Sequence, residues 1–286
     1  MLTKSRPNLF IIGAMKSGST SLHYYLSKHP EIFMCEPKEP WYFIKEVNWS
    51  KGEEWYLSLF KNAGNAKIIG ESSTDYTKLP KYKGVPERIY EFNSGARFIY
   101  VMRDPIERSI SHYWHNVRWH GEKRDMFTTI SEDQHIQDVS NYIMQLSPYW
   151  GVFGKENVYT LTFEEMIRQP QESLARIFSW LGVSTDFVPP NIEKKENVTP
   201  GIVEQIKGVG ALHKFRSSPL WNRVHGFFPE SIKLFAKKFA VTEVKRDSQE
   251  NEKSANLLRP LFLPQVDSLS LELDREFDEW TTLFNR

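Results

Sequence analysis

The segment at residues 10–22, FIIGAMKSGSTSL, constrains the fold of this chain more than any other stretch. The apolar run at residues 8–12 predicts a short buried strand that ends at Gly13. Residues 19–27 repeat apolar side chains at helical spacing and predict a helix. The intervening GAMKSGST is therefore a strand–loop–helix junction, as found in α/β folds.

A junction of this composition is suited to bind phosphate. Backbone N–H groups at a helix N-terminus, together with the helix dipole, attract anions. Gly18 lets the backbone curl around a ligand. The neighbouring side chains supply hydroxyl groups and one positive charge, from Ser17, Ser19, Thr20 and Lys16. We therefore predict that these five residues contact a phosphate group.

The position of the lysine separates this loop from the one that binds nucleoside triphosphates. In that loop the lysine directly follows the second glycine and precedes a serine or threonine that holds magnesium. Here Lys16 precedes Gly18 by two residues, and no clear acidic strand end follows to hold a metal. The spacing argues against an ATP or GTP hydrolase, and we expect no metal ion.

Further apolar runs alternate with helical patterns along the chain. Strands are predicted at residues 67–70, 97–102 and 157–162, and helices at 85–92, 107–119, within 163–181 and at 257–280. This alternation predicts one α/β domain with a mainly parallel central sheet flanked by helices. Ligands of such sheets bind beyond the carboxyl ends of the strands. Three of these ends carry GAMKSGST, ESSTDYT and RDPIERS.

The segment RDPIERS offers a second anion site. Arg103 stands directly at a predicted strand end, and Ser111 follows one to two helical turns later. An arginine in this position can bind a phosphate, with the serine hydroxyl as a further donor. The alternative is a structural ion pair of Arg103 with Asp104 or Glu107, and the sequence leaves both interpretations open.

Together, the loop and the RDPIERS segment resemble the 5′-phosphosulfate and 3′-phosphate signatures of the sulfotransferase superfamily. The resemblance is to bacterial members related to the heparan sulfate and cytosolic sulfotransferases. It implies 3′-phosphoadenosine 5′-phosphosulfate (PAPS) as donor and 3′-phosphoadenosine 5′-phosphate (PAP) as product, with no metal. It also implies that Lys16 and the residues up to Thr20 hold the 5′ group, and that Arg103 and Ser111 hold the 3′-phosphate.

Two further segments extend the resemblance. EPKEPWYFIKEVNWSKGEEWYLSLF is similar to the segment after the loop in heparan sulfate sulfotransferases, which implies Glu39 as catalytic base. FEEMIRQP resembles a motif of cytosolic sulfotransferases whose aromatic residue, here Phe163, packs on adenine. His112 and His115 are the alternative bases, because neutral histidine suits proton abstraction near pH 7.

This chain departs from the glycosaminoglycan enzymes at two positions. Ser72 stands where several of them have a lysine, and Trp41 stands where they often have a histidine, two residues after the base. Both departures weigh against a polysaccharide acceptor. The acceptor is therefore expected to be a small molecule or a carbohydrate with a hydroxyl or an amine.

The resemblance predicts one sulfotransferase domain over residues 1–286. Residues 1–185 would form the PAPS-binding α/β core, residues 186–256 a variable loop and helical region on the acceptor side, and residues 257–286 a C-terminal helix. Within the variable region, residues 201–240 have weakly helical stretches, including a basic amphipathic one at 231–240. Residues 243–256 are highly charged and are expected to be mobile.

Composition sets the remaining expectations. The net charge of +1 gives no field that favours nucleic acid. The single cysteine, Cys35, excludes an internal disulfide and fits a reducing compartment. We recognise no secretory signal or membrane-spanning stretch, so we expect a cytoplasmic protein without stable membrane insertion. The oligomeric state is left open.

Two other classes of function compete with this interpretation. A P-loop-type nucleotide kinase would require ATP and magnesium, and the position of Lys16 argues against it. A non-catalytic module that binds PAP would keep the pocket without the chemistry. The presence of both Lys16 and Glu39 argues against that second alternative.

Overall fold

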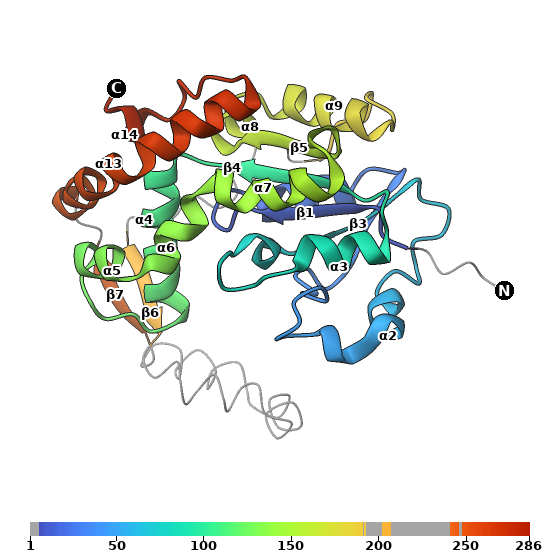
Figure 1. Ribbon diagram of the computed structural model, residues 1–286, viewed down its shortest axis with the longest axis horizontal. Helices are drawn as coiled ribbons and strands as arrows, with labels where there is room; N and C mark the ends of the chain where they lie inside the picture. Colours follow the sequence, from blue (N-terminus) through green and yellow to red (C-terminus); the bar gives the residue numbers. More distant parts are fainter. Residues whose placement is uncertain (1–5, 191, 193–201, 207–240, 246–247) are drawn as a thin grey trace.

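The computed structural model of this protein describes residues 6–190, 192, 202–206, 241–245 and 248–286 (Figure 1). Its centre is a sheet of five strands in the order β2-β3-β1-β4-β5, and every pair in it is parallel. The strands are β1 (Leu9–Gly13), β2 (Ile32–Met34), β3 (Ile68–Ser72), β4 (Arg97–Met102) and β5 (Val158–Thr162). The predicted parallel sheet is confirmed. The sequence prediction missed β2, which has only three residues.

The sheet is buried on both faces because successive side chains of a strand point to opposite sides. In β1, Phe10 and Ile12 join one apolar cluster, whereas Leu9 and Ile11 join the other. Strand β4 divides its side chains between the two clusters in the same way. A core of this kind requires helices on both faces.

Helices cover both faces of the sheet. Residues of α1 (Ser19–Ser27), α8 (Phe163–Arg168) and α9 (Pro170–Leu181) belong to one cluster. The other cluster includes residues of α2 (Gly52–Ser58), α3 (Val85–Phe92), α4 (Pro105–Trp119), α5 (Met126–Glu132), α6 (Gln134–Ser140) and α7 (Tyr142–Phe153). Short 3₁₀ helices lie at η1 (Trp49–Lys51), η2 (Thr74–Thr77) and η3 (Lys155–Asn157).

The C-terminal region differs from the prediction. Helix α13 (Ser248–Leu273) begins well before residue 257 and is followed by the short α14 (Thr281–Phe284). Of the residues 243–256, which we expected to be mobile, 243–245 belong to β7 (Val241–Lys245) and 248–256 to the first turns of α13. The early start of α13 has a physical reason. Its charged first turns carry Ala255 and Leu258, which are buried in the same cluster as α4 and α7.

Part of the variable region is also not helical. Residues 202–206 form strand β6 (Ile202–Ile206), which pairs antiparallel with β7. The two strands are far apart in sequence, so no local hairpin pattern revealed them. The rest of the predicted weakly helical stretch, including residues 231–240, lies outside the described residues. Among the helices that the structure describes, none is long and apolar enough to cross a membrane.

Candidate active site

Each of the five parallel strands leads into one component of the predicted site at the same edge of the sheet. Strand β1 enters the loop with Lys16, β4 ends just before Arg103, and β5 ends just before Phe163. Strand β2 leads to Glu39, and β3 leads into the ESST segment. The carboxyl ends of parallel strands are where ligands bind in open α/β sheets. The fold thus gathers residues that are spread over 150 positions of the chain.

Backbone hydrogen bonds join these segments. The Ser73 N–H donates to the Ile11 carbonyl oxygen at 3.0 Å, and the Glu39 N–H donates to the Ser72 carbonyl oxygen at 2.9 Å. The Thr77 hydroxyl donates to the Ile12 carbonyl oxygen at 2.5 Å. The segment that carries Glu39 is therefore tied to β3, and the end of β3 is tied to β1 just before the phosphate loop.

The phosphate loop is shaped by glycine. Gly18 has φ +90° at the start of α1, a conformation that L-residues rarely adopt. A Cβ atom at Gly18 would lie 2.7 Å from the Phe163 ring and 2.8 Å from Cε of Met166. The turn into α1 therefore needs glycine both for its backbone angle and for the close approach of Phe163.

The loop presents groups that fit an anion. The Ser17 side chain is fully buried, and its hydroxyl has no hydrogen-bond partner among the described residues. No described side chain caps the N-terminus of α1, so its first N–H groups are directed at the loop. Burial, and next the positive charge of Arg103, lower the pKa of Lys16. A ligand with negative charge would offset both effects.

Arg103 lies beside the loop. Its guanidinium stands over the Phe163 ring at 5.0 Å from the centroid, and one nitrogen is 3.5 Å from the Lys16 carbonyl oxygen. It also forms an ion pair with Glu107 at 3.2 Å. The structure thus contains the ion pair considered as the alternative for Arg103. The pair is partly exposed, and pairs of this kind are weak, so Glu107 leaves the guanidinium able to meet a phosphate.

The start of α4 is held rigidly. The Asp104 carboxylate caps the helix by accepting the N–H groups of Ile106 at 3.0 Å and Glu107 at 3.3 Å. Its other oxygen accepts the Leu283 N–H at 2.9 Å, which connects the C-terminal region to this site. Ser111 lies further along α4 and is largely buried. Of the predicted 3′-phosphate residues, Ser111 belongs to α4, and Arg103 directly precedes the Asp104 cap of that helix.

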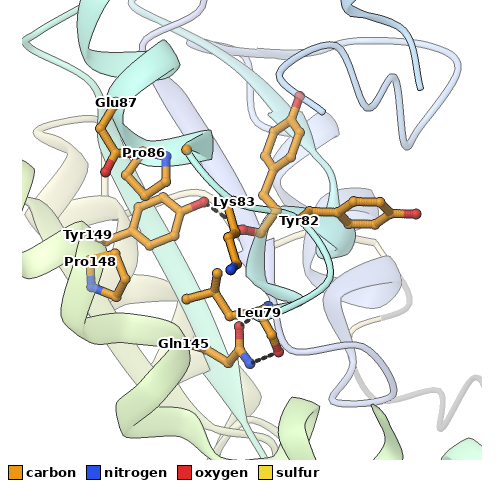
Figure 2. A pocket seen from close by; sticks show the side chains of 10 residues that line it. Leu79, Tyr82, Lys83, Pro86, Glu87, Gln145, Pro148 and Tyr149 are labelled. Carbon is orange, nitrogen blue, oxygen red and sulfur yellow. Dashed lines mark hydrogen bonds between the residues drawn. The ribbon is translucent and has the colours of Figure 1, made fainter. Parts of the chain in front are cut away.

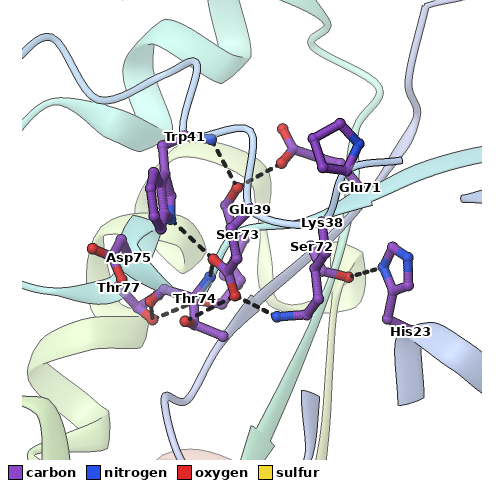
Figure 3. Close-up of polar contacts among 12 residues, drawn as sticks. His23, Lys38, Glu39, Trp41, Glu71, Ser72, Ser73, Thr74, Asp75 and Thr77 are labelled. Carbon is purple, nitrogen blue, oxygen red and sulfur yellow. Dashed lines mark hydrogen bonds and ion pairs between the residues drawn. The ribbon is translucent and has the colours of Figure 1, made fainter. Parts of the chain in front are cut away.

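Glu39 is surrounded by donors (Figure 3). Its Oε2 accepts the Thr74 N–H at 2.9 Å and the Trp41 Nε1–H at 3.0 Å. Its Oε1 contacts the Lys38 ammonium and, at 3.4 Å, the Thr74 hydroxyl. These contacts hold the carboxylate in a fixed position, as a general base at a reacting centre requires. The Glu39 side chain is 22% exposed, so an acceptor can reach it.

Unusual backbone angles coincide with two predicted catalytic residues and with a neighbour of Glu39. Lys16, Glu39 and Trp41 have φ values of 73°, 64° and 49°. Non-glycine residues in this left-handed region each cost on the order of 1–3 kcal/mol and occur preferentially at functional sites. The surrounding hydrogen bonds must offset this strain, and for Glu39 they are the contacts just described.

Glu71 is a second carboxylate close by, and it is fully buried. It accepts hydrogen bonds from the hydroxyls of Tyr56 at 2.6 Å, Ser73 at 2.7 Å and Tyr76 at 2.9 Å. Burial raises the pKa of Glu71 to about 7 despite these three donors. No acceptor can reach a buried carboxylate, so Glu71 is not placed to abstract a proton. Its position suits a structural role in the site.

His112, the alternative base, lies within the protein. Its Nδ1 is 3.2 Å from a guanidinium nitrogen of Arg108. An arginine can only donate, so Nδ1 accepts and the ring proton resides on Nε2. Burial, and next the charge of Arg108, lower the pKa of His112 far below its usual value. This environment favours a neutral structural histidine.

Two other histidines interact with residues at this edge of the sheet. His115 is half-buried, and burial followed by the charge of Lys16 lowers its pKa to about 4. His23 is buried, and its Nδ1 is 2.7 Å from the Ser72 hydroxyl (Figure 3). Burial, then the charge of Lys38, lowers the pKa of His23 to about 4.

Sequence reasoning missed the hydrogen bonds that hold Glu39 and Trp41. Trp41 had been noted only as a departure from relatives, and Ser73 and Thr74 only as part of a polar strand end. The signal available was their place in ESSTDYT, directly after a predicted strand. Ser73 and Thr74 follow Glu39 by more than 30 residues in the sequence. Only the pairing of β2 with β3 brings them close to Glu39 and Trp41.

A pocket of about 210 Å³ lies between the start of α3 and α7 (Figure 2). Its walls include Leu79, whose backbone N–H and carbonyl are both bonded to the Gln145 amide, at 2.8 and 3.0 Å. None of its described lining residues belongs to the predicted donor site. Tyr76 connects this pocket with the Glu71 network.

A comparison with protein families identifies residues 6–232 as a sulfotransferase domain. Because the match covers most of the chain, this protein belongs to the sulfotransferase family.

Among the described residues, no group of three or more histidine, cysteine, aspartate or glutamate side chains is arranged to hold a metal ion.

Relatives illustrate the range of this family. The chain is 40% identical over 116 residues to the membrane-associated sulfotransferase kil1 of Dictyostelium discoideum, which covers 40% of this chain and 24% of that protein. It is 25% identical over 205 residues to heparan sulfate glucosamine 3-O-sulfotransferase 5 of Mus musculus, which covers 68% of this chain and 57% of that protein. The chain therefore spans about a quarter to just over half of these relatives.

A solved structure has the same fold. The crystal structure of a sulfotransferase from Alicyclobacillus acidocaldarius matches with a TM-score of 0.70 at 24% identity. The match covers 96% of this chain and 99% of that one. The arrangement of the parallel sheet and its helices is thus that of a sulfotransferase along nearly the whole chain.

Proposed function

We propose that this protein transfers the sulfuryl group of PAPS to a hydroxyl or an amine of an acceptor and releases PAP. The observation that carries the proposal is the convergence of two anion sites and one reachable carboxylate at the same sheet edge. The loop with Lys16 and the arginine at the end of β4 match a donor with two anionic groups. Glu39 supplies the base.

The donor would bind along the loop and the start of α4. The orphaned hydroxyl of Ser17 and the uncapped start of α1 fit the 5′-phosphosulfate. Gly18, Ser19 and Thr20 would contribute their N–H groups. Arg103 and Ser111 would hold the 3′-phosphate, and Phe163, adjoining both Gly18 and Arg103, would pack on adenine.

Catalysis would rest on positioning and on charge stabilisation, as in phosphoryl transfer. Lys16 would stabilise the negative charge that grows on the bridging oxygen as the S–O bond to PAP breaks. Glu39 would accept the proton of the acceptor as the new bond to sulfur forms. His112 is the less suitable base, because its Nδ1 faces Arg108.

The acceptor is a small molecule or a carbohydrate. Much of the predicted acceptor-side region lies outside the described residues, including the aromatic residues Phe215, Trp221, Phe227 and Phe228. The division of the chain into a donor core, an acceptor region and a C-terminal helix, and its cytoplasmic location, stay predictions.

Thermal unfolding with different ligands tests the proposal. A ligand that binds only the folded state at about 100 times its dissociation constant adds roughly 2.7 kcal/mol, which moves the melting temperature by a few degrees. We expect this shift with PAP and PAPS, and none with ATP and magnesium. Lys16→Ala should lose much of it, whereas the exposed Lys45→Ala should keep it.

The kinase alternative makes the opposite prediction. A shift with ATP and magnesium alone would overturn the sulfotransferase assignment of this site. The non-catalytic module would be favoured if PAP shifts the melting temperature but no hydroxyl or amine acceptor leads to release of PAP from PAPS.

A further inference from the structure

We propose that Trp41 is a positioning residue that fixes the Glu39 carboxylate and selects Oε1 as the oxygen that receives the proton. The inference rests on the proposed function of Glu39 as base. It concerns the position where relatives often have a histidine and this chain has an indole.

The two carboxylate oxygens of Glu39 have different surroundings. Oε2 accepts two directed N–H groups, from the Thr74 backbone at 2.9 Å and from Trp41 Nε1 at 3.0 Å. Oε1 contacts the ammonium of Lys38, which is partly exposed, and a hydroxyl of Thr74 at 3.4 Å. Because fixed donors occupy Oε2, the oxygen left to accept a proton is Oε1.

Trp41 is itself held in place by a buried chain of hydrogen bonds (Figure 3). The Trp41 backbone N–H donates to the Ser73 hydroxyl at 3.2 Å. That hydroxyl donates its single proton to Glu71 at 2.7 Å, so its oxygen is oriented to accept the N–H. The left-handed φ of Trp41, 49°, turns the indole back toward Glu39, two residues earlier.

The chemistry of indole makes this role specific. The Nε1–H group donates and never accepts, so Trp41 cannot take the acceptor proton or pass it on. A histidine in its place would change its charge near neutral pH. The indole therefore gives the base a donor whose charge stays constant, and it leaves proton transfer to Glu39 alone.

Three variants separate positioning from packing. Trp41→Phe keeps the aromatic ring and removes the donor, Trp41→His restores a donor, and Trp49→Phe is the matched control in the same segment. PAP release from PAPS is measured with 2-naphthol and glucosamine as hydroxyl and amine probes. We expect Trp41→Phe to lower kcat about tenfold or more while KM for PAPS stays within about twofold. Trp41→His should recover a large part of kcat, and Trp49→Phe should resemble the wild type.

A second measurement does not depend on turnover. The indole ¹H–¹⁵N signal of Trp41 is assigned by its absence in Trp41→Phe. Glu39→Gln should move this signal upfield, because the charged acceptor is replaced by a neutral amide. Trp49→Phe should leave it in place.

The outcomes of the two measurements are distinguishable. The inference is overturned if Trp41→Phe has the kcat of the wild type, or if the indole signal of Trp41 does not move in Glu39→Gln. Either result counts even where the protein sulfates the probes. A wild-type protein that binds no PAP overturns the proposed function. If the probes are not turned over, the position of the indole signal alone decides whether Trp41 binds Glu39.

Discussion

The buried carboxyl group of Glu71 should make the stability of this protein fall as pH rises. Burial raises its pKa from 4.5 to about 7, so the folded protein holds a proton that the unfolded chain releases. The stabilisation is fully present below about pH 4.5 and is lost as pH rises through about 7. A difference of about 2.5 pKa units corresponds to about 3 kcal/mol in the free energy of unfolding.

Glu71→Gln isolates this effect, because the amide is neutral at every pH and keeps the shape of the side chain. Its carbonyl oxygen can accept from Tyr56 and Tyr76, and its NH₂ group can donate to Ser73, whose hydroxyl must then rotate. The assay is urea unfolding followed by tryptophan fluorescence at several pH values. The quantity to follow is the difference between wild type and variant, which cancels the titration of other groups.

We expect that difference to change by about 3 kcal/mol between pH 4.5 and 7.5, with the wild type losing stability relative to Glu71→Gln. The exposed Glu91→Gln is the control for the loss of one carboxylate. A wild-type-minus-variant difference that stays constant over this pH range would refute the reasoning. It would mean that the three hydroxyl donors keep Glu71 ionised in spite of its burial.

Three further predictions concern the donor and the base. Glu39→Gln should lower turnover heavily and leave the PAP-induced melting shift intact, and near-normal PAP release would rule out Glu39 as base. Arg103→Ala should lower the affinity for PAPS far more than the affinity for adenosine 5′-phosphosulfate, which lacks the 3′-phosphate. Competition binding measures both affinities, and equal losses would mean that Arg103 is purely structural. Gly18→Ala should lower the free energy of unfolding by about 2 kcal/mol or more, because Gly18 has φ +90° and a Cβ atom there would meet Phe163. The same variant should no longer bind PAP. A melting temperature and PAP affinity like those of the wild type would contradict the shape assigned to the loop.

Local patterns were sufficient for the main elements of the fold. The helices at residues 19–27 and 85–92 and the strand at 97–102 have the predicted bounds. The loop with Lys16 and Arg103 could be placed at strand ends because each directly follows an apolar strand in sequence. Such signals are short-range, since one strand and the turn after it specify them.

Elements with weak or distant signals escaped prediction. Strand β2 has three residues and depends on β3 for its pairing. Strands β6 and β7 are separated by more than 30 residues, and α13 begins in a charged segment whose buried residues are few. In each case, contacts with remote parts of the chain decide the local structure.

The sequence by itself determined the α/β class, the strand–loop–helix junction at Gly13–Thr20 and the family to which this protein belongs. The tertiary structure alone decided how Glu39 is held. It joins Glu39 to Thr74 and Trp41, and it bonds Trp41 to Ser73 and Ser73 to the buried Glu71. No spacing rule contains this arrangement, because hydrogen bonds between side chains on different strands depend on which strands are neighbours in the sheet, and that order is a property of the whole fold.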